Sequence, residues 1–460
     1  MAIRLLVFFL FSHIFASPAI YILATDVEPE NKQVVIQLQN HQDKGHFFTI
    51  RVGDPSYNYR FTMLLDISHP SIWIPAQGCD NCFGSFLYNC SQNQQTCFQD
   101  KDKPPTELVY HSISALATKG FEMIHFKGIP VTESFNHTVY LASQISEHIH
   151  NYNIDGVFGM GLDNPSEGRV SILRSLYENG WISSQCFSLY LIHNPGGSDT
   201  KSHIVFGGYD PDYIHNSTTD FMRAPVVSEN YWAVSLKGIV LENEEIPLKS
   251  TIALLSNSFS DIGMPKEDLE EILNVLKEKG IDCELIHEDV NPLCKCPKNK
   301  IDNFPHLMFQ LDGFNINISR SCYVNFRAKA FHEKLDPEAV KGYNCFLRFR
   351  MINQIMNPLD KKDEYRTWVF GRTVLNDYYT LFDQDNKQIG FAPARTEGQD
   401  YQTMLNEILL YCVLGFFFVG FSLLFFIYKC VGLRRKLQSK RLLDNQEEPI
   451  VSMKSSGLYM

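Results

Sequence analysis

The sequence predicts a mostly β protein with two related lobes, followed by one C-terminal transmembrane helix. The first observation is an internal repeat: residues 64–75 and 254–265 share two leucines, a serine, an isoleucine and a proline at a constant offset of 190. The second is that the surrounding chain consists of short apolar and aromatic runs bounded by Gly, Pro, Asn and Asp, a pattern typical of strands. The third is that residues 408–428 contain no charged side chain.

Length and charge narrow the class of protein. The chain has 460 residues, of which 44% are hydrophobic, so it is long enough for two lobes with large cores and too apolar to be disordered. It carries 41 basic and 52 acidic side chains, for a formal charge of −11. Because nucleic-acid binding depends on concentrated Lys and Arg, and the first 400 residues contain no basic stripe, a nucleic-acid partner is not expected.

The N-terminal segment resembles that of a secreted protein. Arg4 precedes an apolar run from Leu5 to Phe15, which is followed by small residues, as in a cleaved signal peptide. We assign residues 1–19 to this signal peptide. Residues 20–44 form a short leader segment that is not long enough for an extended basic prosegment.

Two lobes are expected to follow, an N-terminal lobe over residues 45–215 and a C-terminal lobe over residues 216–396. A Val-Phe-Gly tripeptide follows each copy of the repeat, at residues 157–159 and 369–371, so the landmarks come in the same order in both halves. Helix signals are few. The best is residues 266–279, where four apolar residues lie on one face.

The C-terminal part of the chain predicts a membrane anchor. After a stalk over residues 397–407, residues 408–428 would extend about 31 Å as a helix at ~1.5 Å per residue, enough to cross the hydrocarbon core. The tail, residues 429–460, starts with a basic cluster, so the positive-inside rule places it in the cytosol and the rest of the chain in the lumen or outside the cell. The protein is thus predicted to be a single-pass type I membrane protein. The cluster consists of Lys429, Arg434, Arg435, Lys436, Lys440 and Arg441.

Cysteines and sequons fit this secreted setting. Ten cysteines precede the predicted span, and in an oxidising compartment they favour disulfides over a zinc site, so no metal is expected. The sequence alone does not determine their pairing. The disulfide candidates are Cys79, Cys82, Cys90, Cys97, Cys283, Cys294, Cys296, Cys322 and Cys345. Glycosylation is expected at four N-x-Ser/Thr sequons, which begin at Asn89, Asn136, Asn216 and Asn317.

Taken in order, several segments resemble the pepsin family of bilobal aspartic peptidases. Residues 61–66 running into 72–75 look like the first active-site strand and loop, and residues 155–161 look like the hydrophobic-hydrophobic-glycine element of that family. Residues 206–210 resemble its lobe-crossing segment, and residues 379–392 its closing strands. The resemblance covers nearly all of residues 45–395. It implies a pepsin-like fold of two β-barrel-like lobes that requires no cofactor.

The resemblance also implies a pair of catalytic aspartates, one from each lobe. In that family, two carboxylates about 3 Å apart share a proton and activate a water. Each aspartate there is followed by a hydroxyl residue and a glycine. Here the first copy reads Asp66-Ile67-Ser68 and the second Ser256-Asn257-Ser258. Asp66 therefore takes the first catalytic position, and Ser256 takes the position of the missing second aspartate.

A serine cannot replace that second carboxylate, because its hydroxyl neither titrates near working pH nor shares a proton with Asp66. The sequence therefore predicts a peptidase fold with little or no peptidase activity. Asp261 is the only obvious substitute acid, and strand geometry would put it on the far side of the loop. His69, with Asp66 and Ser256, would make a Ser-His-Asp arrangement, but the loops of the family are not built to provide an oxyanion hole.

The cleft between the lobes is still expected to bind. Tyr110 matches the tyrosine that the family carries on a flap over its substrate, although the flap glycines are missing. The predicted function is a binding or scaffolding protein for a peptide or protein ligand in this interlobe cleft. One alternative is an active aspartic endopeptidase whose second acid the sequence does not reveal. Another is a structural or adhesive module with a closed cleft.

Overall fold

The computed structural model describes most of the chain between residues 32 and 444. The described residues are 32–40, 45–57, 59–82, 86–93, 96–100, 102–110, 113–126, 134–146, 154–192, 202–215, 220–246, 248, 251–296, 301–326, 340–352, 366–394 and 397–444. The predicted signal peptide and Asn216 lie outside them. The chain divides into two units, one made of Met1–Pro211 and Asp220–Ala392, and one made of Asp212–Thr219 and Pro393–Met460.

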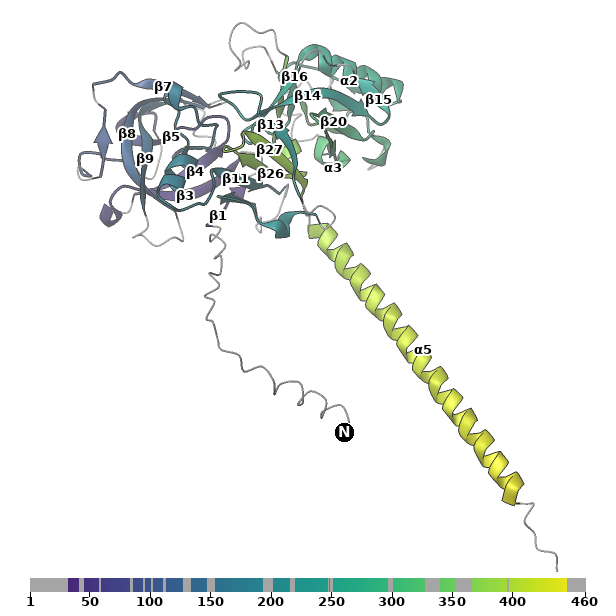
Figure 1. The fold of residues 1–460 in the computed structure, drawn as a ribbon. Coiled ribbons are helices and arrows are strands. Elements are labelled where there is room, and N and C mark those ends of the chain that lie inside the picture. Colours follow the sequence, from purple (N-terminus) through teal and green to yellow (C-terminus); the bar gives the residue numbers. More distant parts are fainter. Residues whose placement is uncertain are drawn as a thin grey trace, which may run out of the picture. The chain divides into compact units, whose positions relative to one another are not determined.

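The first unit contains most of the strands, and its N-terminal half is organised around a large sheet (Figure 1). The order is β2-β3-β4-β10-β5-β9-β8-β6, with β7 paired to β8. These strands are β2 (Gln39–Asn40), β3 (His46–Val52), β4 (Arg60–Asp66), β5 (Ile72–Asp80), β6 (Phe98–Gln99), β7 (Thr106–Tyr110), β8 (Ile113–Phe126), β9 (Phe135–Ile145) and β10 (Gly156–Gly159).

The C-terminal half of this unit repeats the arrangement around a second sheet, in the order β21-β20-β14-β16-β25-β17-β24, with β15 paired to β14. In the first half, β10 is parallel to β4 and antiparallel to β5; in the second, β25 is parallel to β16 and antiparallel to β17. The sequence repeat is therefore also a structural repeat. The strands are β14 (Ala233–Leu241), β15 (Glu244–Ile246), β16 (Thr251–Leu255), β17 (Ile262–Met264), β20 (Leu307–Leu311), β21 (Asn315–Ile318), β24 (Phe349–Met351) and β25 (Arg366–Phe370).

A third sheet contains strands from both halves and one strand from the expected leader. The sheets therefore do not follow the expected division into leader and lobes. The order of the third sheet is β1-β12-β11-β26-β27-β13. The expected leader contributes β1, because Val34 and Ile36 alternate with exposed residues and bury their side chains against the body. The strands are β1 (Val34–Gln37), β11 (Cys186–Tyr190), β12 (His203–Phe206), β13 (Met222–Pro225), β26 (Tyr378–Asp383) and β27 (Gln388–Pro393).

Helices are few and short in this unit. The longest, α2 (Lys266–Glu278), starts at the predicted residue and buries Leu269, Ile272 and Leu276 on one face. The other short helices among the described residues of this unit are α1 (Ile172–Glu178), α3 (Arg320–Tyr323), α4 (Arg372–Leu375), η1 (Pro55–Tyr57), η3 (Pro165–Glu167) and η5 (Ile301–Asn303). The helix η4 (Pro211–Tyr213) begins at the last residue of Met1–Pro211 and continues into the second unit. The mostly β prediction is thus confirmed.

Four disulfides staple the described chain, and three of them close short loops. They join Cys79 to Cys82, Cys90 to Cys97, Cys283 to Cys294, and Cys296 to Cys345. The last two hold a small sheet, β18 (Cys283–Glu284), β19 (Leu293–Cys294), β23 (Cys345–Leu347) and β22 (Val324–Asn325). Cys322 differs from the expectation that it belongs to a disulfide. It is a free thiol whose Sγ donates to Asp377 Oδ1 at 2.9 Å.

The second unit is dominated by the helix α5 (Glu397–Asp444), drawn in yellow in Figure 1. Within it, Phe417–Arg441 is long and apolar enough to cross a membrane, judged by length and composition. This segment overlaps the predicted span over residues 408–428. The helix also begins at the first residue of the predicted stalk, so the stalk residues are helical.

Candidate active site

Asp66 is the last residue of β4, and its side chain is fully buried. β10 runs beside it with Gly159 in register, and Met160 N donates to Asp66 O at 2.7 Å. A Cβ at Gly159 would lie 2.3 Å from His69 O and 2.4 Å from Ser71 O. Only glycine lets the loop after Asp66 pass this close to β10, so the Val-Phe-Gly element fixes the path of the loop.

Hydrogen-bond donors of the protein itself surround the Asp66 carboxylate. Oδ1 accepts from Ser68 N at 2.6 Å and from the Ser68 hydroxyl, and Oδ2 accepts from the Ser258 hydroxyl. Ser68 and Ser258 are equivalent residues of the repeat, and they stand where the resemblance expects glycines. Both oxygens of Asp66 are therefore engaged by two serines, one from each half of the unit.

Asn257 links the two loops through its side chain. It is fully buried, Oδ1 accepts from Ile67 N at 3.0 Å, and Nδ2 donates to Leu65 O at 2.8 Å. The equivalent residue in the first loop is Ile67, whose side chain cannot return such bonds. We call these two bonds of Asn257 the clasp. They come only from the loop after β16, through an amide that both donates and accepts.

Ser256, the expected position of the second acid, follows β16 and is half-buried. Its backbone N donates to Phe370 O at 3.1 Å, next to the last paired residues of β16 and β25. The hydroxyl that reaches Asp66 belongs to Ser258, two residues further on. Sequence reasoning missed this contact, although Ser68 and Ser258 already coincide in the repeat.

The two remaining sequence candidates have other partners. His69 Nδ1 accepts from Ser71 N at 3.1 Å, whereas a Ser-His-Asp triad needs that nitrogen to donate to the carboxylate. Burial and the Arg169 charge lower the pKa of His69 to about 3. Asp261 is buried and its carboxylate pairs with Arg350 at 3.1 Å and with Arg348 at 3.9 Å. Neither hypothesis agrees with these contacts.

A buried imidazole and a guanidinium lie near the clasp. Arg372, the first residue of α4, is 6% exposed, and its Nη1 donates to Asn257 O at 3.0 Å. His46, the first residue of β3, is fully buried, and within the described part of the chain its ring nitrogens have no hydrogen-bond partner. Burial and then the Arg372 charge lower the pKa of His46 to about 3. This imidazole is therefore neutral at neutral pH.

The residues expected to form the flap lie in a pair of strands. β7 and β8 pair antiparallel as far as Tyr110 and Ile113. The Tyr110 side chain lies outside the described residues, so its expected role over the cleft stays a prediction.

A separate polar cavity of about 440 Å³ does not include Asp66. It is lined by Leu162, Asp163, Asn164, Pro165, Ser166, Arg174, Gln185, Glu229, Gln384, Asp385 and Lys387.

The chain is similar to known proteins over most of its length. Residues 45–394 match the profile of the eukaryotic aspartyl protease family. Pepsin A of Sus scrofa is 23% identical over 366 residues, which cover 77% of this chain and 83% of the relative. Cathepsin E of Rattus norvegicus is 23% identical, covering 78% and 82%. Renin of Echis ocellatus is 25% identical over 370 residues, covering 79% and 83%.

Proposed function

Because this chain belongs to the eukaryotic aspartyl protease family over residues 45–394, we propose that it is a pepsin-like peptidase homologue that has lost peptidase activity and binds peptides or proteins instead. The observation that carries the proposal is the environment of Asp66. Its two oxygens accept from the hydroxyls of Ser68 and Ser258. In a working dyad, this carboxylate instead shares a proton with a second carboxylate about 3 Å away.

The loss of one acid has a large expected cost. General acid or base catalysis contributes about 10²- to 10⁴-fold to rate, and groups that act together lose more than either alone. A serine hydroxyl at position 256 offers no charge and no titration at working pH. Peptide binding does not require the dyad, because an extended peptide is held by backbone hydrogen bonds and side-chain pockets. The pepsin-like fold can therefore still bind a peptide without catalysing its cleavage.

A membrane setting is part of the same proposal. We infer that residues 1–19 are a cleaved signal peptide and that the apolar part of α5 anchors the chain with its C-terminal tail in the cytosol. The first unit would then face the lumen or the cell exterior. Two sequon asparagines, Asn136 and Asn317, are exposed there and suitable for glycosylation, and the proposal includes Asn89 and Asn216 as further acceptors.

The experiment is a cleavage and binding assay on the full chain purified in detergent. A diverse peptide library is incubated between about pH 3 and 7, with and without pepstatin, beside an Asp66→Ala variant. We expect no cleavage above background at any pH, and we expect mass spectrometry to find a subset of library peptides that co-purifies with the chain.

Two outcomes would contradict the proposal. Pepstatin-sensitive cleavage that disappears in Asp66→Ala would mean that the chain is an active aspartic endopeptidase with an unrecognised second acid. An absence of both cleavage and bound peptides would instead favour a structural or adhesive module with a closed cleft.

A further inference from the structure

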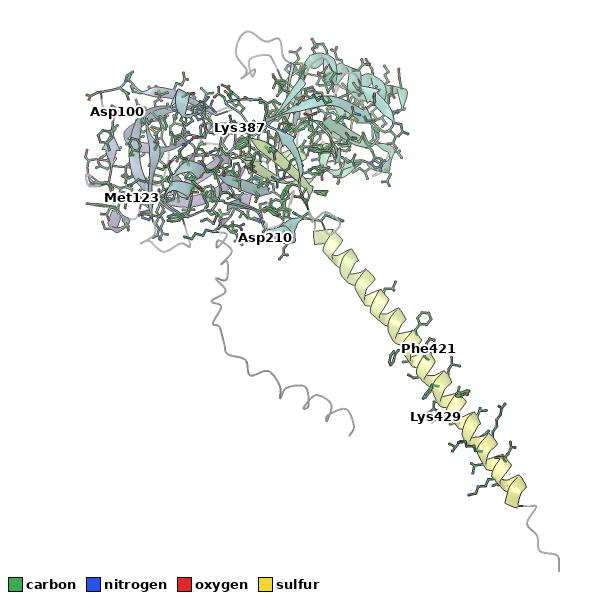
Figure 2. All side chains as sticks on the ribbon, in the orientation of Figure 1. Asp100, Met123, Asp210, Lys387, Phe421 and Lys429 are labelled. Atoms are coloured by element: carbon green, nitrogen blue, oxygen red, sulfur yellow. A yellow bond between two sulfur atoms is a disulfide. The ribbon has the colours of Figure 1, made fainter. Side chains whose placement is uncertain are left out.

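The apolar helix of the second unit continues without a break into a basic segment. α5 extends to Asp444, and residues 417–441 contain six Lys or Arg and no Asp or Glu. Figure 2 shows Phe421 in the apolar part and Lys429 at the start of the basic part. All six cations are exposed. We call them the basic collar: Lys429, Arg434, Arg435, Lys436, Lys440 and Arg441.

The helical spacing distributes the basic collar around the whole axis. At ~100° per residue, Lys429, Lys436 and Lys440 share one direction, because they are seven and four residues apart. Arg434 and Arg441, seven residues apart, point about 130° away from them, and Arg435 points about 120° further round. The cations therefore face three directions of roughly equal spacing.

This distribution distinguishes between two ways of meeting a membrane. A helix that lies in the interface needs one apolar and one polar face. The basic collar has no such division, since every side of the helix carries a cation. It therefore fits a helix that stands upright in the bilayer and is surrounded by headgroups.

The structure also indicates where the bilayer surface meets the helix. Lys429 Nζ lies 5.5 Å from the centroid of the Phe425 ring, so the first cation folds back over the last aromatic residues of the apolar segment. Arg434, Arg435 and Lys436 then lie within about 10 Å of Lys429 along the axis at ~1.5 Å per residue, while Lys440 and Arg441 lie about 16–18 Å away. The Debye length at physiological salt is about 8 Å, so the nearer group lies at or just beyond one Debye length from Lys429, and Lys440 and Arg441 lie at about two.

We propose that the basic collar binds anionic glycerophospholipid headgroups in the leaflet where α5 leaves the bilayer, an inference that rests on the membrane anchoring proposed above. The cytoplasmic leaflet carries a negative surface potential that attracts juxtamembrane Lys and Arg within a Debye length. The nearer cations, Lys429 and Arg434 to Lys436, provide most of the attraction. Lys440 and Arg441 extend beyond its range.

The test uses the full chain reconstituted into phosphatidylcholine bilayers. Electron paramagnetic resonance measures how strongly spin-labelled phosphatidylserine and a spin-labelled phosphoinositide associate with the protein, relative to spin-labelled phosphatidylcholine. We expect a preference of roughly threefold or more for the anionic lipids at low salt, falling towards one at about 1 M salt, where the Debye length is ~3 Å. Preference for both anionic lipids assigns the binding to charge, and preference for the phosphoinositide alone assigns it to the inositol phosphates.

A matched pair of variants tests the geometry, because each removes two charges from the same helix. Arg434→Gln with Lys436→Gln should abolish most of the preference, while Lys440→Gln with Arg441→Gln should retain most of it. Equal effects of the two variants, or no preference in the unmodified chain, would overturn the proposal. Alkaline carbonate extraction tests the membrane anchoring separately from the lipid binding. A chain that is released from the membrane overturns both proposals. A chain that stays in the membrane but shows no lipid preference overturns the lipid proposal alone.

Discussion

At the scale of the residue, Asp66 keeps its place in the strand but has different neighbours from those that catalysis needs. Its carboxylate accepts from Ser68 and Ser258, which stand at positions where the family resemblance expects glycine. A glycine there would have no side chain to bond the carboxylate. The hydrogen bonds from the two serine hydroxyls make Asp66 part of the loop structure.

The neighbouring serines 256 and 258 offer a direct test of that structural role. Ser258→Ala removes the only described donor to Asp66 Oδ2 and leaves a buried carboxylate oxygen without its bond. The expected loss is about 1–3 kcal/mol in the free energy of unfolding. Ser256→Ala is the control, with an expected change within about 0.5 kcal/mol, because it removes a half-buried hydroxyl that makes no described bond to Asp66. Chemical denaturation of both variants measures the difference, and equal losses would contradict this role.

At the scale of the element, the loops after β4 and β16 depend on each other. In the described structure, Asn257 makes both side-chain bonds of the clasp, to Ile67 N and Leu65 O, and Arg372 in turn donates to its carbonyl. The loops belong to segments 190 residues apart. One side chain therefore couples the ends of two distant strands.

The clasp predicts a graded series at position 257. Asn257→Ala leaves a buried N–H and a buried C=O without partners, so we expect a loss of about 2–5 kcal/mol in the free energy of unfolding. Asn257→Thr keeps a group that both accepts and donates, so its loss should be smaller than that of the alanine variant. Urea denaturation with the m-value as a check measures both. A threonine variant no more stable than the alanine variant would contradict the clasp.

Elements differ in how far the sequence predicts them. The helix α2 is predictable because a 3.6-residue period of apolar positions is a local signal, and the structure begins it at the predicted Lys266. β1 was not predicted, because only Val34 and Ile36 mark it and its partner β12 lies about 170 residues away in the chain. The candidate active site also has one part that the sequence predicts and one that it does not. The repeat pairs Asp66 with residue 256, but the path of the loop decides that Ser258 contacts the carboxylate.

At the scale of the whole molecule, buried histidines determine how stability responds to pH. His46 and His137 are at most 2% exposed. Burial is the main cause that lowers the pKa of each to about 3, with smaller contributions from the charges of Arg372 and Lys119 respectively. The unfolded chain takes up these protons near pH 6.5, whereas the folded chain does not. Both groups therefore stabilise the fold fully above pH 6.5, and this contribution is lost as the pH falls towards 3.

Because the folded chain has the lower histidine pKa values, we expect the protein to be less stable in acid. With His69, whose pKa is also lowered to about 3, three extra protons bound by the unfolded state give a slope of roughly 4 kcal/mol per pH unit between about pH 6 and 4. Glu122 opposes it, because burial raises the pKa of its carboxyl and favours the fold at low pH. His46→Phe isolates one histidine: its imidazole has no described hydrogen bond to lose, and the variant should reduce the slope by about a third.

Denaturation of the full chain between pH 4 and 8 measures this slope, with His287→Asn as a control because the His287 ring is 61% exposed. We expect the control to keep the steep loss below pH 6 and His46→Phe to flatten it. The result bears on function, since a dyad that shares one proton works in acid, where this fold loses stability. A chain that remains equally stable down to pH 4 would contradict the argument and would make acid peptidase chemistry more compatible with the fold.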